Sequence, residues 1–189
     1  MNLDHTFTID SLLEGCKRGE RKAQENLYRT LSARMMAVCM RYAKDSYEAE
    51  DMLQMGFVKV FTKVAEFRSE GSFEGWIRRI MVNTAIETYR KNLRTLSVVD
   101  IDVVYDQPQS TFDMNQLETK DLMTLVQQLS NGYRMVFNMY VIEGYSHREI
   151  SETLGITEGA SKSQLSRARA ILKEKILKIE GSNYATHTG

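Results

Sequence analysis

The side chains best suited to chemistry in this sequence lie between residues 161 and 178, where six lysines and arginines stand with one acid, Glu174. On a helix, which turns by about 100° per residue, the segment divides into two stripes. The packing stripe is Ser161, Leu165, Ala168, Leu172, Ile176 and Ile179, and the polar stripe is Lys162, Ser166, Arg169 and Lys173. Because lysine neutralises phosphates and arginine can donate two parallel bonds to guanine, the polar stripe predicts contact with DNA.

Short-range signals predict how this helix is held. Ser146 and Glu149 have the S-x-x-E spacing of a capping box, in which the two side chains close the start of a helix. Gly155 suits the left-handed residue that ends that helix, and Thr157 can cap the next one. Two helices joined by such a turn form the helix-turn-helix pattern, which places its second helix in the major groove of DNA. For the charges alone, the alternative is a solvated basic helix.

The composition favours an all-α protein of the cytoplasm. The 189 residues include one proline and 11 methionines, and 25 basic residues balance 25 acidic ones. Cys16 and Cys39 have neither CxxC spacing nor a nearby histidine pair, so we expect buried thiols in a reducing cytosol and no metal site. No apolar run approaches ~18 residues and no signal peptide is recognisable, which predicts no membrane span. No phosphate-binding loop or catalytic triad is present, so we expect no enzyme activity, cofactor or small-molecule substrate.

The N-terminal half predicts packed helices, one of which has an unusual face. Apolar residues recur at every third or fourth position over residues 27–42 and again over 49–64. On the second of these helices, Asp51, Gln54, Met55 and Val58 fall together, away from the packing stripe. An apolar pair beside a carboxylate and an amide is typical of a protein-binding surface, and a solvated helix face is the alternative.

Residues 66–75 interrupt the helical pattern with glycines and with Phe67 and Phe73 among charges. Residues 76–94 then resume as a basic helix with five basic residues and one acid. Aromatic rings beside a basic helix can hold the unstacked bases of single-stranded DNA, and the alternative is that the rings fill the core. Residues 95–119 contain five acids and no basic residue, which predicts a flexible linker.

Two stretches resemble the bacterial RNA polymerase sigma factors of the sigma-70 family. Region 2 is similar to DSYEAEDMLQMGFVKVFTKVAEFRSEGSFEGWIRRIMVNTAIETYRK, and region 4 to LSNGYRMVFNMYVIEGYSHREISETLGITEGASKSQLSRARAIL. Their order and spacing resemble the extracytoplasmic-function (ECF) group, which keeps only these two domains. The resemblance implies an all-α fold with a region 2 domain over 1–94, a flexible acidic linker over 95–119, a region 4 domain over 120–180 and a disordered tail over 181–189.

The resemblance also implies contacts. The helix with Asp51, Leu53, Gln54, Met55 and Val58 would bind the clamp coiled coil of core RNA polymerase, and the polymerase flap is a second implied partner surface. The implied contacts to the −10 promoter element are Phe67, Phe73, Arg79, Asn83, Arg90 and Lys91. Those to the −35 element are Lys162, Ser163, Ser166, Arg167, Arg169 and Lys173. Two positions depart from the family pattern: Met55 stands where glutamate is usual, and Ser130 where a proline is common.

The predicted function is therefore that of a sigma factor that brings core RNA polymerase to promoter DNA and is a monomer when free. Many relatives are paired with a membrane-associated anti-sigma factor, and the sequence leaves open whether one binds here. The first alternative is a stand-alone helix-turn-helix regulator whose N-terminal half senses a ligand or dimerises. A third class is a helical adaptor whose N-terminal domain binds only protein. Core polymerase should create promoter-specific initiation only if the chain is a sigma factor.

Overall fold

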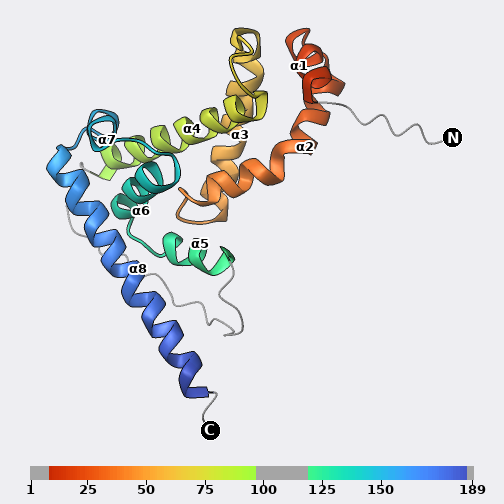
Figure 1. Cartoon of the computed structure of the whole chain (residues 1–189). Coiled ribbons are helices and arrows are strands. Elements are labelled where there is room, and N and C mark those ends of the chain that lie inside the picture. Colours follow the sequence, from red (N-terminus) through yellow and green to blue (C-terminus); the bar gives the residue numbers. More distant parts are fainter. Residues whose placement is uncertain (1–8, 97–118, 187–189) are drawn as a thin grey trace. The chain divides into compact units, whose positions relative to one another are not determined.

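The computed structural model describes residues 9–96 and 119–186, and every regular element in those two ranges is a helix (Figure 1). The prediction of an all-α fold is confirmed. The chain clusters into two compact units, residues 1–88 and 89–189. Two predictions lie partly outside the described residues: most of the acidic linker over 95–119 and the last three residues of the tail. No helix in the described ranges is long and apolar enough to cross a membrane.

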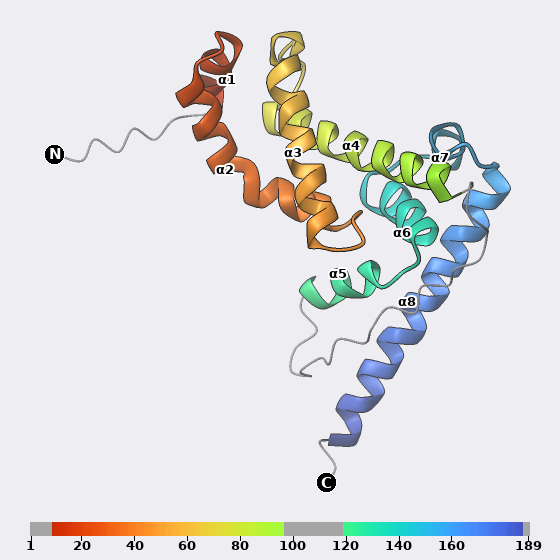
Figure 2. The same ribbon diagram turned by 180° about the vertical axis from the view of Figure 1, so that it is seen from behind.

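The first unit packs three long helices around an apolar core. Helices α1 (Ile9–Lys17), α2 (Arg21–Met40) and α3 (Ser46–Lys63) are followed by the short η1 (Val64–Glu66) and by α4 (Phe73–Leu96). Figures 1 and 2 show α2 beside α3 from opposite sides, and α1 packs against α2. The stripes predicted from periodicity are buried: Leu27, Leu31, Met35, Val38 and Tyr42, and then Ala49, Met52, Leu53, Gly56, Phe57 and Val60.

Local side chains fix where the helices of the first unit begin. The Asp45 carboxylate accepts a hydrogen bond from the Glu48 backbone N–H at 2.8 Å, and Glu48 in turn accepts from the Lys44 N–H at 2.6 Å. Asp45 and Glu48 therefore stabilise the start of α3. The Ser72 hydroxyl accepts from the Gly75 N–H at 3.0 Å and caps α4, so Phe73 is the first helical residue. The interrupted segment is consequently shorter than predicted and spans 67–72.

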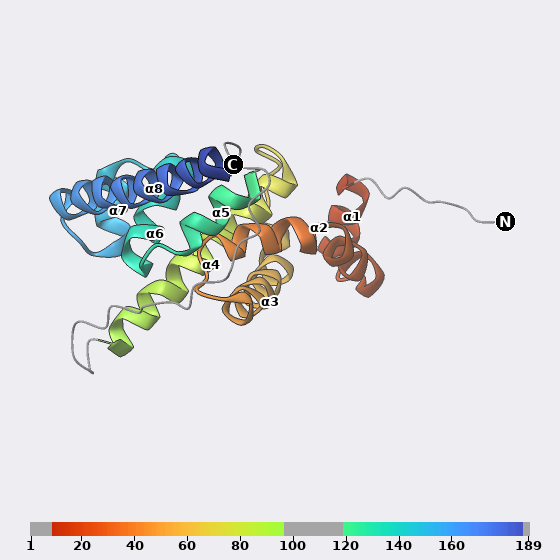
Figure 3. The ribbon, with the colours of Figure 1, turned by 90° about the horizontal axis from the view of Figure 1, so that it is seen from below.

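The second unit has a separate core beneath the helix-turn-helix. Its helices are α5 (Thr119–Gln127), α6 (Asn131–Phe137), the π-helical turn η2 (Asn138–Ile142), α7 (His147–Leu154) and α8 (Glu158–Thr186). Figure 3 shows α5 and α6 lying along α8. The buried cluster is Leu125, Val126, Leu129, Ala168 and Leu172, with Ile176 and Ile179 partly buried against it. The predicted packing stripe of the long helix is thus confirmed.

Arg134 is a fully buried cation in this core that sequence reasoning missed. Its guanidinium donates to the Gln127 carbonyl at 2.7 Å and to the Asn131 side chain at 2.6 Å. Gln127 is the last residue of α5, where carbonyls lack helical partners and a positive charge is favourable. Arg134 therefore ties the end of α5 to α6.

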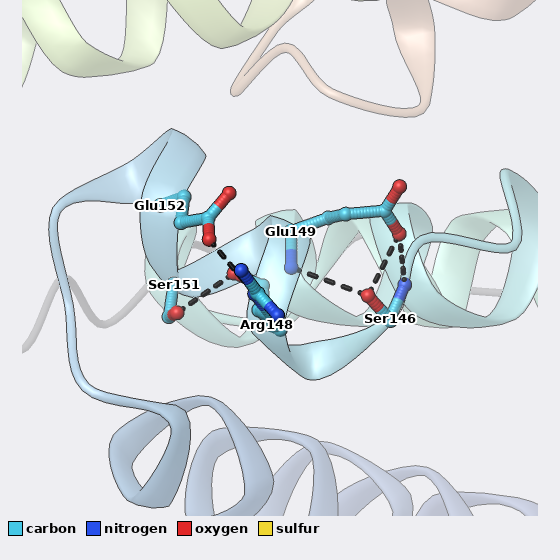
Figure 4. A network of polar contacts seen from close by, with 5 residues as sticks. All are labelled: Ser146, Arg148, Glu149, Ser151 and Glu152. Atoms are coloured by element: carbon cyan, nitrogen blue, oxygen red, sulfur yellow. Dashed lines mark hydrogen bonds and ion pairs between the residues drawn. The ribbon is translucent and has the colours of Figure 1, made fainter.

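The helix-turn-helix forms as its spacing predicts (Figure 4). The Glu149 carboxylate accepts from the Ser146 N–H at 2.8 Å, and the Glu149 N–H donates to the Ser146 hydroxyl at 3.2 Å, which closes the capping box. Gly155 has the left-handed φ of 70°, and Thr157 accepts from the Ala160 N–H at 3.0 Å. The capping predictions are confirmed. The long helix runs on to Thr186, so the prediction of a disordered tail from Gly181 is wrong for residues 181–186.

Candidate nucleic-acid interface

The exposed side of α8 follows from which of its residues are buried. Ala168 and Leu172 face the core, so the outward side carries short side chains edged by lysines. The outward residues are Lys162, Ser163, Ser166, Ala170 and Lys173, and all are exposed. Short side chains let a helix approach a groove closely, while lysines at the edges can reach phosphates. Lys162 also lies 3.8 Å from Glu158, an exposed pair that costs little to break.

Arg167 and Arg169 occupy the two edges of this surface. They precede and follow the buried Ala168, so each is rotated about 100° from the packing direction, on opposite sides. Arg167 donates to the Tyr133 hydroxyl at 3.5 Å. The Arg169 guanidinium lies over the ring of Tyr140, 5.8 Å from its centroid. Each arginine is therefore exposed and also contacts a tyrosine of the α6–η2 segment, which periodicity did not predict.

His147 connects α7 to α8 through its side chain. It is half-buried, and its Nδ1 lies 2.9 Å from the Ser161 hydroxyl in a hydrogen bond. Its ring also stacks on Tyr140, with centroids 4.5 Å apart. Ser161 is completely buried, and this bond explains why a polar residue lies in the packing stripe of α8. The first turn of α7 is thereby attached to the first turn of α8.

Electrostatics in the second unit are dominated by local pairs. The hydrogen bonds from the Ser146 backbone and hydroxyl lower the pKa of Glu149 from its ordinary value of 4.5. Lys178, 2.7 Å from Glu174, likewise lowers the pKa of that carboxyl. The single acid of the basic segment is thus engaged with a lysine one turn away.

On α3, the structure brings together four of the five predicted polymerase contacts. Asp51, Gln54, Met55 and Val58 are all exposed on one side of the helix. Leu53 is only 6% exposed and packs in the core, so in this conformation it supports the face from behind. Tyr47 is 79% exposed and was missed. Its spacing of four, seven and eleven residues from Asp51, Gln54 and Val58 could have revealed it.

The aromatic residues around the start of α4 form a packed cluster. Phe73 is 4% exposed and its ring lies 5.2 Å from that of Phe67 and 5.7 Å from that of Trp76. The expectation that Phe67 and Phe73 offer free rings to bases is wrong for this conformation, because both are buried in the first unit. Packing the rings together is favourable because it removes their apolar surface from water.

The predicted basic and polar contacts of α4 lie at its surface. Arg79, Asn83, Arg90 and Lys91 are exposed, and Asn83 follows Arg79 by one helical turn. The preceding segment contains Ser69 with a φ of 59° and Gly71 with a φ of 111°. A left-handed serine is uncommon and costs about 1–2 kcal/mol, and such strain is concentrated at functional sites.

Two family models match the chain at the elements just described. Sigma-70 region 2 matches residues 27–95, from α2 through α4, and Sigma-70 region 4 matches residues 119–172, from α5 into α8. Together they cover about two thirds of the sequence. The chain belongs to the sigma-70 family of RNA polymerase sigma factors.

Curated relatives place this sigma factor in the ECF group. The ECF RNA polymerase sigma factor SigE of Mycolicibacterium smegmatis is 28% identical over 161 residues, which are 82% of this chain and 62% of that relative. The ECF RNA polymerase sigma-E factor of Haemophilus influenzae is 25% identical over 185 residues, 90% of this chain and 96% of the relative. The RNA polymerase sigma-H factor of Pseudomonas aeruginosa is 25% identical over 87% of this chain and 92% of its own length.

Membership of the family accounts for the general activity of this sigma factor, which is to direct transcription initiation. Sigma factors are initiation factors, and RNA polymerase performs the synthesis of RNA. The expected sites divide between the two matched regions: the α3 and α4 residues lie in region 2, and the −35 residues from Lys162 to Arg169 lie in region 4. Lys173 is the first residue beyond the region 4 match.

Proposed function

We propose that this sigma factor binds core RNA polymerase through the exposed face of α3, contacts the −10 element with α4 and reads the −35 element with α8. The observation that carries this proposal is the pair of exposed basic helices, one in each matched region. A stand-alone repressor needs only one such helix per subunit to bind its operator. A promoter has two separate elements, so a protein that contacts both needs two such helices. The cytoplasm is the proposed location, because the chromosome and its polymerase are there.

For the −35 element, the proposed readers are on the outer side of α8. One edge carries Lys162, Arg169 and Lys173 and the other carries Arg167, with Ser163 and Ser166 between them. Serine hydroxyls can bond to bases or phosphates, and arginine has the forked donors that guanine requires. A base-reading arginine loses about 1–3 kcal/mol at one base position when it is changed to alanine, whereas a phosphate contact loses affinity evenly.

For the −10 element, the burial of Phe67 and Phe73 moves the proposed DNA contact to other groups. Arg79, Arg90 and Lys91 can neutralise the backbone, and Asn83 can hydrogen-bond a base edge. The strained segment 67–72 is the proposed site for an extruded base. The packed rings of Phe67 and Phe73 hold this segment in its conformation. The proposed role of Phe67 and Phe73 is therefore to support the segment that contacts DNA.

For the polymerase, the proposed contact with the clamp coiled coil is Tyr47, Asp51, Gln54, Met55 and Val58, supported from the core by Leu53. Aromatic residues and methionine are enriched at protein interfaces, and Tyr47 is the most exposed large hydrophobic side chain of the described residues. In the second unit, the proposed contact with the flap is a mostly apolar groove lined by Phe137, Leu172, Ile176 and Leu177 and edged by Arg169 and Lys173. A membrane-associated anti-sigma factor would have to cover one of these faces to prevent initiation.

Reconstitution with core RNA polymerase tests the proposal. Core enzyme should give no defined transcripts on genomic templates by itself, and addition of the full chain should produce transcripts with defined start sites. Asp51→Arg should abolish both co-purification and defined starts. Glu25→Arg, the same change of charge on the exposed side of α2, serves as the matched control. Defined starts that do not depend on the chain would contradict the proposal, and tight binding to palindromic DNA without polymerase would favour a stand-alone regulator.

A further inference from the structure

We propose that Tyr140 is a positioning residue for DNA recognition, whose ring holds the Arg169 guanidinium in the orientation that contacts DNA. The proposal rests on the proposed function of α8. It is drawn from a chain of contacts that links η2, α7 and α8. Ser161 bonds to His147, the His147 ring stacks on Tyr140, and Tyr140 lies beneath Arg169.

The anchored end of this chain of contacts is Ser161. Its side chain is completely buried, so the hydrogen bond of 2.9 Å to His147 is shielded from water and fixes the position of the imidazole. The imidazole and the Tyr140 ring are nearly parallel, with 24° between their planes and 4.5 Å between their centroids. The Tyr140 ring is therefore oriented by a neighbour that is itself held by the start of α8.

The free end is Arg169, which is exposed and lies 5.8 Å from the ring centroid. A guanidinium held over the face of an aromatic ring by a cation–π contact can still donate its N–H groups to phosphate or guanine. An arginine held in this way loses less conformational entropy on binding than one that samples all its rotamers in water. Tyr140 should thus improve affinity for DNA without touching DNA.

The π turn explains how two tyrosines come to hold arginines on opposite edges of α8. Tyr133 and Tyr140 are seven residues apart and would share a face of an uninterrupted α-helix. Tyr140 lies in η2, where a turn takes more residues than in an α-helix and changes the direction of the side chain. Tyr133 contacts Arg167 through its hydroxyl, whereas Tyr140 contacts Arg169 through its ring. This difference provides a matched control.

The experiment is a double-mutant cycle on the full-length chain. Binding to a fluorescein-labelled duplex of random sequence is measured by anisotropy at low ionic strength, and each variant is melted in parallel. Tyr140→Leu should weaken binding about two- to five-fold, as expected for loss of an exposed cation–π contact. Tyr140→Phe keeps the ring and should bind as the wild type does. In the Arg169→Ala background, Tyr140→Leu should have no further effect.

Tyr133→Leu is the control for the cycle, because it removes a tyrosine that contacts Arg167 and should weaken binding equally with and without Arg169. If Tyr140→Leu lowers the melting temperature, Arg169→Lys replaces it, since lysine keeps the charge but stacks poorly. The positioning role would be overturned if Tyr140→Leu had the same effect with and without Arg169. It would also be overturned if Tyr140→Leu bound DNA more tightly, because the ring would then withhold Arg169 from DNA. Unchanged binding by Arg169→Ala would instead overturn the DNA contact of Arg169 itself.

Discussion

The two basic helices of this sigma factor, α4 and α8, use their aromatic neighbours in different ways. At the start of α4, the rings of Phe67, Phe73 and Trp76 pack against one another, and the two phenylalanines are buried. Beside α8, the rings of Tyr133 and Tyr140 are only half-buried and touch the arginines that edge the proposed DNA surface. Both arrangements place aromatic rings next to basic residues, yet the rings stabilise the first unit and orient side chains in the second.

This contrast shows that proximity of rings and cations in a sequence does not determine what the rings do. The buried fraction of each ring decides it. A buried phenylalanine contributes mainly through apolar area, so its loss should appear as lost stability. A half-buried tyrosine retains a face or hydroxyl for a cation, so its loss should appear mainly as lost affinity.

The largest expected effect is that of Phe73→Ala. The ring is buried, so its removal should cost about 3–5 kcal/mol of unfolding free energy in the first unit. Trp76, the single tryptophan, packs against Phe73 and reports urea unfolding of this unit by fluorescence. Initiation by this variant should not recover on templates opened in advance across the −10 element. Recovery on such templates at an unchanged urea midpoint would show that the ring acts on DNA. The rings near α4 and those near α8 would then not differ in role.

The two capping serines provide the next comparison. Ser146→Ala removes the two bonds of the Ser146 hydroxyl, to the Glu149 N–H and to the Glu149 carboxylate, but keeps the bond from the Ser146 backbone N–H. Ser72→Ala removes one bond at the start of α4. We expect Ser146→Ala to cost about 1–2 kcal/mol and Ser72→Ala about 0.5–1 kcal/mol. Native-state hydrogen exchange of the α7 and α4 amides measures each cost locally. A larger loss in α4 would mean that the start of α4 has support besides its cap.

The stability of α7 should depend on pH through the capping box of Ser146 and Glu149. The folded-state pKa of Glu149 is lowered by its bonds to Ser146, so the ionised carboxylate contributes stability above pH 4.5. That contribution is lost as the pH falls from 4.5 through the lowered value. Hydrogen exchange of α7 should therefore quicken over this acidic window, and Glu149→Gln should remove the dependence. An identical acid response in the Glu149→Gln variant would assign the loss to other carboxylates.

The smallest expected effect on stability is that of Asp51→Arg on α3. The side chain is exposed and lies away from the core, so the unfolding free energy should change by less than about 0.5 kcal/mol. Co-purification with core polymerase should nevertheless be lost. Tyr47→Ala should have the same pair of effects if Tyr47 belongs to this face. Normal recovery of core enzyme by both variants would place the polymerase contact elsewhere.

The features that the sequence predicts well are local. Ser146, Glu149, Gly155 and Thr157 act within one or two helical turns, and their geometry follows from spacing alone. The packing stripes of α2, α3 and α8 were predictable because burial repeats with the helical period. The second face of α3 was found in the same way, although Tyr47 was overlooked one turn earlier.

The features that the sequence did not predict depend on contacts between elements. The bond from His147 to Ser161 joins two helices, and the Arg134 bonds join α5 to α6. The sequence left two alternatives open for Phe73, because a ring beside glycines fits a loop as well as a core. The contacts with Phe67 and Trp76 favour the core. The π turn at η2 has no periodic signature in the sequence.

The proposed function requires that α4 and α8 read two separate promoter elements. The decisive measurement is initiation with core polymerase on a panel of promoters, each mutated at one position of the −35 or −10 element. Asn83→Ala represents α4 and Arg167→Ala represents α8. We expect Asn83→Ala to change the response only to −10 mutations and Arg167→Ala to change it only to −35 mutations. If both variants changed the response to the same element, α4 and α8 would not read separate elements.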